Sequence, residues 1–250
     1  MDFRLPGRRC LFSEFLDLLF PPHCIGCEER VYEPTYLCPR CSCDLENHRV
    51  NEEDLKRLKD KNLFLFPDEK LYVLAPFWDE DEEETGVRRC IHLMKYQGRH
   101  DIARMLGKAC GSFLPSLNDN SDMLMCPVPL HFYKKIQRGF NQSYEICRGI
   151  QEVFPIPIVP ILRRVKHTGP QVGANWEVRD KQLQGAFELD PSCPSLLGKN
   201  CLLVDDVLTT GSTLSECTSL LHQAKARVHI LVVAAVIGSK KKPSKCTWVS

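Results

Sequence analysis

The chain has 250 residues, 43% of them hydrophobic, and a formal net charge of +1. This length and apolar content suffice for one domain of ordinary size with a small additional module, and they exclude a disordered tail. Because a net charge so close to zero gives no long-range field that attracts nucleic acid, any such binding has to come from a local basic patch.

Cysteine is abundant, with 14 residues in the chain. Most of these cysteines stand singly inside apolar runs, as small buried side chains do in proteins of a reducing compartment. The sequence contains no apolar run near the ~20 residues that a membrane span requires. We therefore expect a cytoplasmic protein with no membrane span.

The N-terminus is basic and then apolar, as a secretory signal peptide is, but Glu14 and Asp17 interrupt its apolar region. Leucine and phenylalanine recur there at helical spacing, and Pro21 and Pro22 follow. This pattern favours an amphipathic docking helix that ends before the two prolines.

Two Cys-x-x-Cys knuckles follow, separated by a short polar stretch. Four thiolates in this arrangement can surround one Zn²⁺ tetrahedrally and leave no coordination position for water. We therefore predict a structural zinc site that supports a segment too small to have its own core. The predicted ligands are Cys24, Cys27, Cys38 and Cys41. His23 and Cys43 are adjacent spare donors, and either can replace one ligand.

A highly charged stretch over residues 52–62 separates this module from the rest of the chain and is typical of a surface helix or a linker. We expect the amphipathic helix and zinc module in residues 1–50, a charged linker or helix in residues 51–70, and a larger domain in residues 71–250.

The larger domain has the pattern of an α/β fold. Short apolar runs alternate with segments of helical periodicity, which predicts a parallel sheet with flanking helices. Strands are expected near Val73, Met125, Val159, Val204 and Val232.

A basic segment follows the run near Met125. Lys134, Lys135 and Arg138 can neutralise a pyrophosphate or a nucleic-acid backbone, and Asn141 and Gln142 can donate hydrogen bonds. For the two lysines, a solvated helix face is the alternative interpretation.

Residues 201–213, with the sequence CLLVDDVLTTGST, combine a strand, a phosphate-sized loop and the start of a helix. The apolar run of residues 201–204 is typical of a strand buried on both faces. Asp205 and Asp206 follow it at the carboxyl end of the strand, where they can accept hydrogen bonds from sugar hydroxyls or help to hold a hydrated Mg²⁺.

The small residues after the acidic pair predict an anion site, because backbone amides at a helix N-terminus favour a bound phosphate. These loop residues are Thr209, Thr210, Gly211, Ser212 and Thr213. Thr213 and Glu216 fit a capping box, which predicts that the helix begins just after the loop.

The segment VDDVLTTGST resembles the phosphoribosyl pyrophosphate (PRPP) signature of type I phosphoribosyltransferases. The resemblance implies that residues 209–213 hold the 5-phosphate of PRPP, that Asp205 and Asp206 contact its ribose, and that Mg²⁺ binds with it. It also implies a catalytic role for this acidic pair and for Arg138, which would stabilise the departing pyrophosphate.

A polar segment over residues 163–179 contains Gly169, Pro170 and Gly173 and is typical of a long mobile loop. The same resemblance implies that this loop closes over the ligand. Closure would bring Arg163, Arg164, Lys166 or Arg179 toward the pyrophosphate, where positive charge is most effective.

The double knuckle, the PVPL and RGFNQ segments and the PRPP signature are together similar to the competence protein F family, over nearly the whole chain. The resemblance implies a type I phosphoribosyltransferase-like parallel sheet plus a small N-terminal zinc ribbon. It also implies a role in handling incoming single-stranded DNA with a helicase-like partner. Lys134 and Lys135 stand where arginine is more usual in that family, and lysine offers a point charge instead of a two-pronged donor.

Two classes of function therefore remain open. The chain can be a phosphoribosyltransferase, such as a nucleobase salvage enzyme, that transfers the sugar to a base or amine. Alternatively, it can bind PRPP or a nucleotide phosphate without turnover, as a single-stranded-DNA-binding accessory of a competence helicase. The sequence identifies neither the acceptor nor the oligomeric state.

Overall fold

The computed structural model describes residues 21–31, 35–47, 50, 52–61, 69–78, 86–112, 114, 123–166 and 185–237. The expected N-terminal docking helix and Arg179 lie outside these residues, as do the side chains of Lys134 and Lys135.

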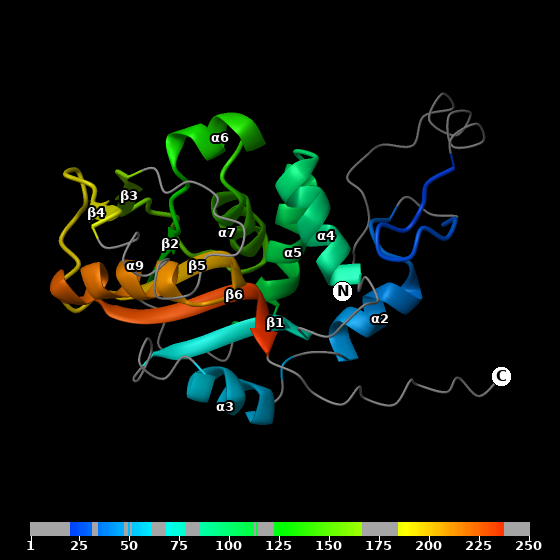
Figure 1. The fold of residues 1–250 in the computed structure, drawn as a ribbon, viewed down its shortest axis with the longest axis horizontal. Coiled ribbons are helices and arrows are strands. Elements are labelled where there is room, and N and C mark those ends of the chain that lie inside the picture. Colours follow the sequence, from blue (N-terminus) through cyan, green and yellow to red (C-terminus); the bar gives the residue numbers. More distant parts are fainter. Residues whose placement is uncertain are drawn as a thin grey trace.

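A four-stranded parallel sheet forms the centre of the structure (Figure 1). The strand order is β1 (Lys70–Trp78), β6 (Arg227–Ile237), β5 (Asn200–Leu208) and β2 (Met123–Pro127). Parallel neighbours need crossover connections, and helices supply these here. The predicted α/β class with a parallel sheet is confirmed.

Alternate residues of β5 pack on opposite faces of the sheet. Leu202 and Val204 join the apolar cluster of one face, whereas Cys201 and Leu203 join the cluster of the other, and all four are fully buried. Helices therefore cover both faces, as expected for a parallel sheet.

Different helices cover the two faces of the sheet. The first comprises α4 (Gly86–Tyr96), α5 (His100–Gly111) and α7 (Gln142–Val153), and the second comprises α3 (Glu52–Lys61) and α9 (Ser212–Gln223). In Figure 1, α4, α5 and α7 lie above the strands and α3 lies below β1. The charged stretch predicted as a surface helix or linker is thus α3, whose Leu58 is fully buried against the sheet.

The strand expected near Val159 is reduced to one parallel bridge, between Ile158 and Met125. The Val159 N–H donates to the Met125 carbonyl, and the Met125 N–H donates to the Pro157 carbonyl. The prolines at positions 155, 157 and 160 explain the short pairing, because proline has no N–H to donate to a ladder. Beside the sheet, β3 (Leu162–Arg164) and β4 (Phe187–Leu189) form an antiparallel pair.

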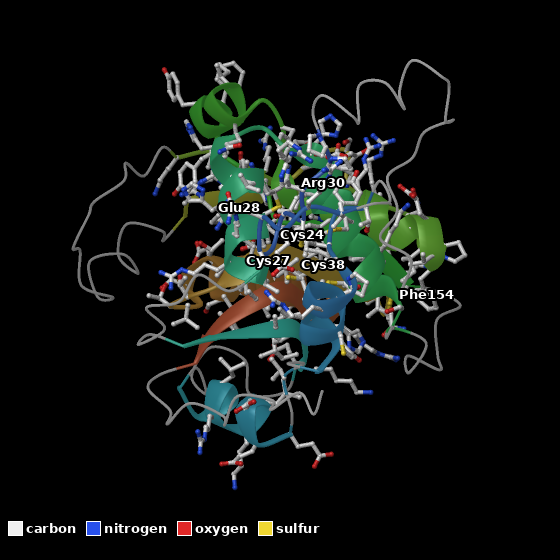
Figure 2. All side chains as sticks on the ribbon, turned by 90° about the vertical axis from the view of Figure 1, so that its right-hand side faces the viewer. Cys24, Cys27, Glu28, Arg30, Cys38 and Phe154 are labelled. Carbon is white, nitrogen blue, oxygen red and sulfur yellow. The ribbon has the colours of Figure 1, made fainter. Side chains whose placement is uncertain are left out.

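The cysteine module shares its apolar core with the first helical layer. Leu37 and Leu45, the latter from α2 (Pro39–Asn47), belong to the same buried cluster as Ile91 and Met94 of α4. Figure 2 views the structure from the side of this module. The module is thus packed onto the large domain and has little core of its own.

Helices α5 and α7 cross at very short range because both carry glycine at the crossing. A Cβ on Gly107 would lie 2.1 Å from the Ile146 carbonyl oxygen, and a Cβ on Gly149 would lie 2.1 Å from that of Arg104. Backbone atoms cannot turn aside as a flexible side chain can. The crossing therefore determines where the N-terminus of α7 lies.

We predict that Gly107→Ala will lower the free energy of unfolding by about 1–3 kcal/mol or more, because the added methyl group forces two helices apart. Urea denaturation measures the change. Lys108→Ala on the same helix is the control, since the Lys108–Glu152 ion pair is exposed and such pairs contribute little. Equal stability of the two variants would contradict this account of the crossing.

Candidate functional site

The acidic pair lies inside β5, because the strand continues beyond the expected end at residue 204 and stops at Leu208. Asp205 is paired in register with Val232 of β6, and Val207 with Ala234. Both carboxylates are partly buried. They are thus held by sheet hydrogen bonding at the carboxyl end of the strand, where ligands bind in α/β folds.

Asp205 accepts two hydrogen bonds at one carboxylate oxygen. The Ser143 hydroxyl donates to Oδ1 at 3.0 Å, and the backbone N–H of Asp206 donates to the same atom at 2.9 Å. Burial, and then the negative charge of Asp206, raise the pKa of Asp205 to about 7, although both hydrogen bonds and Lys95 oppose the shift. Folding therefore makes this carboxyl easier to protonate than an ordinary aspartate.

Asp206 pairs with a lysine from α4. Lys95 Nζ lies 3.1 Å from Asp206 Oδ2, and the two side chains are only 20% and 13% exposed. Lys95 belongs to the Lys-Tyr-x-Gly sequence at the end of α4, but sequence reasoning did not assign it to the site. This short sequence was the only feature that could have indicated a role for Lys95 at the acidic pair.

The loop after β5 ends in a left-handed turn. Gly211 has a φ of 80°, a conformation that suits glycine, and it is the N-cap residue of α9. The hydroxyl oxygens of Thr210 and Ser212 lie 3.4 Å apart. Within the described residues no side chain caps this helix. Its first backbone amides thus lie at the loop, as an anion site requires.

The predicted capping box of Thr213 and Glu216 is wrong. Helix α9 begins at Ser212, inside the loop sequence, so Thr213 is already a helical residue. The Glu216 carboxylate instead accepts a hydrogen bond of 2.7 Å from the Gly185 N–H. This contact joins α9 to the segment that leads into β4.

The RGFNQ segment holds α7 in place. The Asn141 side chain accepts from the Ser143 N–H at 3.0 Å and donates to the Val128 carbonyl at 3.1 Å. Arg138, the last residue of α6 (Phe132–Arg138), donates to the Gln142 side-chain oxygen at 3.2 Å. The segment therefore fixes Ser143 at the acidic pair, a supporting role that sequence reasoning missed.

Arg163 and its neighbour Arg164 make different contacts. Arg163 makes an exposed ion pair of 2.7 Å with Glu188 of β4. The guanidinium carbon of Arg164 lies 5.1 Å from the ring centre of Phe187. Burial lowers the pKa of Arg164, although Cys217 and Asp205 oppose the shift. Because neighbouring strand residues point to opposite sides, the two arginines have different surroundings.

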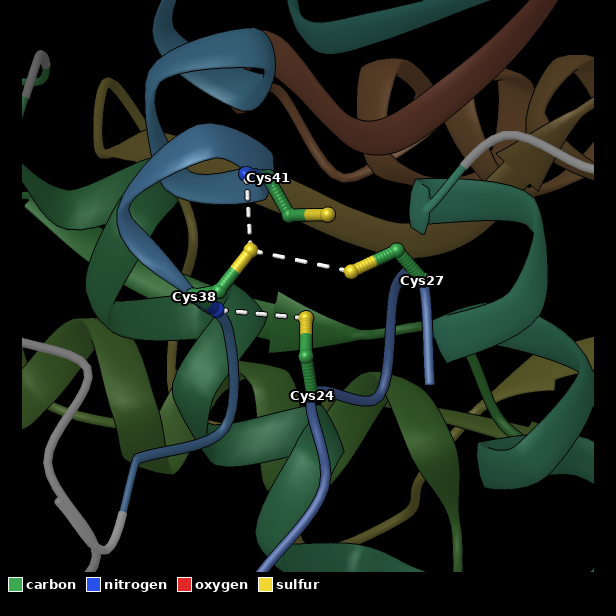
Figure 3. A group of neighbouring side chains, drawn as sticks. All are labelled: Cys24, Cys27, Cys38 and Cys41. Atoms are coloured by element: carbon green, nitrogen blue, oxygen red, sulfur yellow. Dashed lines mark hydrogen bonds between the residues drawn. The ribbon is translucent and has the colours of Figure 1, made fainter. Parts of the chain in front are cut away.

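The four predicted zinc ligands come together, with the sulfur atoms of Cys24, Cys27, Cys38 and Cys41 all within 4.8 Å of one another (Figure 3). Cys27 Sγ and Cys38 Sγ are 3.7 Å apart. Tetrahedral thiolates at about 2.3 Å from Zn²⁺ are separated by about 3.8 Å, so the set fits this ion.

Backbone amides support the cysteine cluster: the Cys38 N–H donates to Cys24 Sγ at 3.1 Å, and the Cys41 N–H donates to Cys38 Sγ at 3.4 Å. The backbone of His23 forms an antiparallel β-bridge with that of Arg30, and neither His23 nor Cys43 belongs to the cysteine cluster. Four cysteines in a closed set leave no position for a reacting water, so the metal would be structural.

Helix α4 connects the cysteine cluster with the acidic pair. At its start, Arg89 pairs with Glu28 of the first knuckle, and Gly86 lies against Gly26. At its end, Lys95 reaches the acidic pair. The two sites are thus at opposite ends of one helix.

Comparison with known families divides the chain in the same way. Residues 142–250 match the family described as phosphoribosyl transferase domain, and residues 15–52 match the double zinc ribbon domain. No helix in the described part of the chain is long and apolar enough to cross a membrane.

Curated relatives concern competence and DNA use. Competence protein F of Haemophilus influenzae is 39% identical over 98 residues, which are 39% of this chain and 43% of that protein. DNA utilization protein YhgH of Escherichia coli is 30% identical over 138 residues, 52% of this chain and 59% of that protein. Competence protein ComFC of Bacillus subtilis is 23% identical over 208 residues, 81% of this chain and 79% of that protein.

The chain therefore spans about half the length of the first relatives it matches, 43% for one and 59% for the other.

Among solved structures, a hypoxanthine phosphoribosyltransferase of Staphylococcus aureus is 16% identical with a TM-score of 0.35, covering 58% of this chain and 71% of that one. Such a distant likeness says nothing about the ligand of this chain.

We predict that Gly26→Ala will speed zinc release to a chelator by about tenfold or more, as changes around metal ligands commonly do. The new Cβ would lie 2.8 Å from Cys41 Sγ, whereas a Cβ on Gly86 would lie 3.4 Å from the Gly26 Cα, an ordinary contact. Gly86→Ala is therefore the matched control. Equal release rates from both variants would contradict the assignment of the zinc site.

We predict that Asp205→Asn will stabilise the protein at pH 8 but not at pH 4. A carboxyl whose pKa is raised by folding to about 7 costs stability as pH rises from about 4 through 7. At about 1.4 kcal/mol per pKa unit, the advantage of the uncharged variant grows to roughly 4 kcal/mol at most. Urea denaturation at several pH values measures it.

Asp101→Asn provides a control of opposite sign. Burial alone would raise the pKa of Asp101, but hydrogen bonds from Arg99 outweigh it and lower the pKa. This variant should lose stability near pH 7, and its deficit should shrink as pH falls below 4. A pH-independent effect of Asp205→Asn would show that the Asp205 carboxyl is not perturbed.

Proposed function

We propose that the chain is a phosphoribosyltransferase-like protein of the competence protein F kind, and that it binds PRPP with Mg²⁺ at the carboxyl end of β5. The matches to the phosphoribosyl transferase and double zinc ribbon domains and the likeness to competence proteins support this proposal. The observation that carries the proposal is that the acidic pair and an uncapped helix N-terminus follow each other on one strand, loop and helix.

The loop of residues 209–213 is the proposed site of the 5-phosphate. Gly211 allows the backbone to turn so that the first amides of α9 can donate to phosphate oxygens, and the hydroxyls of Thr210 and Ser212 lie beside them. The positive end of the helix dipole favours the phosphate further.

The acidic pair is the proposed ribose site. Ser143 and the Asp206 N–H occupy Oδ1 of Asp205, and Lys95 contacts Oδ2 of Asp206. The remaining oxygen of each carboxylate is the proposed acceptor for one ribose hydroxyl. Two adjacent hydroxyls on a five-membered ring can match two adjacent carboxylates.

The pyrophosphate is proposed to lie toward the N-terminus of α7, where Arg138 is half-buried beside Gln142. Lys134, Lys135, Asn141, Arg163 of β3 and Arg179 remain candidates for this group or for nucleic acid. Mg²⁺, when bound with PRPP, would neutralise pyrophosphate charge. In a transferase, a nitrogen nucleophile would bond to C1 of the ribose as the C1–O bond breaks, and the electron pair would leave with pyrophosphate.

A specific observation favours a second function, the binding of single-stranded DNA without turnover. Phe132 and Tyr133 on α6 are 66% and 64% exposed, and Lys134 and Lys135 follow them in the sequence. Exposed aromatic rings beside basic residues suit stacked bases and a phosphate backbone. The relatives named for competence and DNA utilization support a role in DNA use. We propose that the protein would exert this role in the cytoplasm, with a helicase as partner.

Calorimetric titration of the zinc-loaded protein with PRPP and Mg²⁺ tests the first function. We expect saturable binding that is lost in Asp205→Ala/Asp206→Ala and kept in Asp190→Ala, a carboxylate that caps a turn near β4. Absence of binding to the wild-type protein would refute the proposal. A screen for pyrophosphate release with nucleobases then separates the two functions, because turnover with one base makes the protein a transferase.

A further inference from the structure

Two adjacent carboxylates at the end of a strand suit two kinds of ligand. Their oxygens can coordinate a divalent cation, or they can accept hydrogen bonds from the neutral hydroxyls of a sugar. The surroundings of the pair decide between the two, and within the described residues Lys95 forms an ion pair with Asp206.

Lys95 is held at the pair by the position of α4. Met94 and Ile91 anchor this helix in the apolar cluster, with 0% and 5% exposure. Contacts of Gly86 and Arg89 with the first knuckle hold its other end. Because the Lys95 and Asp206 side chains are largely buried, salt screens their attraction much less than that of a surface pair.

The positive charge of Lys95 lies beside the carboxylate that a metal ion would have to approach. A divalent cation at Asp206 would meet an ammonium group 3.1 Å from one carboxylate oxygen.

We propose that Lys95 is a built-in counter-ion that makes the acidic pair select the hydroxyls of a sugar and reject a free divalent cation. The inference rests on the proposed function, since it names what distinguishes the ribose from Mg²⁺ at the same carboxylates. Lys95 neutralises Asp206 without occupying the second oxygen, so a hydroxyl can donate there while the lysine remains. Any Mg²⁺ then enters with the pyrophosphate and not alone at the acidic pair.

Lys95→Gln tests the proposal, because glutamine can still donate a hydrogen bond to Asp206 but carries no charge. The zinc-loaded protein is titrated with Mn²⁺ alone at pH 7.5, and free Mn²⁺ is followed by electron paramagnetic resonance. We expect at least tenfold tighter Mn²⁺ binding by Lys95→Gln than by the wild-type protein. The gain should disappear in Lys95→Gln/Asp206→Asn, which locates the ion at the pair.

Two further variants complete the design. Lys95→Arg keeps the charge and should bind Mn²⁺ as weakly as the wild-type protein. Lys95→Met removes both charge and donor, and it replaces the glutamine variant if that one does not fold. Equal Mn²⁺ affinity of wild-type and charge-free proteins, whether strong or absent, would overturn the proposal.

A second titration uses ribose 5-phosphate, with and without Mg²⁺. The wild-type protein should bind it equally in both conditions, whereas Lys95→Gln should bind it more tightly when Mg²⁺ is present. The Mn²⁺ measurement contains no phosphoribosyl ligand, so it can succeed even if the proposed function fails. If the wild-type protein binds no ribose 5-phosphate or PRPP, the function is wrong, and the rejection of metal by Lys95 is judged by Mn²⁺ alone.

Discussion

Two adjacent, partly buried carboxylates repel each other and lose hydration, so they need compensation from several directions. Two compensating groups come from different helices: the Ser143 hydroxyl from α7 and the Lys95 ammonium from α4. The sheet adds the Asp206 N–H. Much of the surrounding helix packing serves to position these groups at the carboxyl end of β5.

The close crossing of α5 and α7 and the zinc module both contribute to this delivery. The glycines at the crossing determine the position of α7 relative to α5. The Asn141 side chain hydrogen-bonds both to the first turn of α7 and to the carbonyl at the end of β2, so that Ser143 faces Asp205. At the other side, the knuckle of the zinc module contacts the start of α4, whose last turn carries Lys95. A structural metal far from the acidic pair thereby belongs to the same framework.

The sequence predicted the parts of this structure that depend on local pattern. Apolar runs such as residues 201–204 predict buried strands, and the spacing of the four cysteines predicts their convergence, because both signals lie within a few residues. The predicted capping box does not form, because the Glu216 carboxylate accepts a hydrogen bond from the N–H of Gly185, 31 positions away in the sequence. Lys95 and Ser143 could not be assigned to the acidic pair for the same reason, since their distance to it is set by helix packing.

The measurement that tests the central claim most directly is hydrogen–deuterium exchange with and without PRPP and Mg²⁺. If the phosphate lies at the N-terminus of α9, the amides of residues 209–215 will become protected when the ligand is added. Unchanged exchange there, with protection appearing elsewhere in the chain, would show that PRPP binds at another place and that this loop is a turn without a ligand.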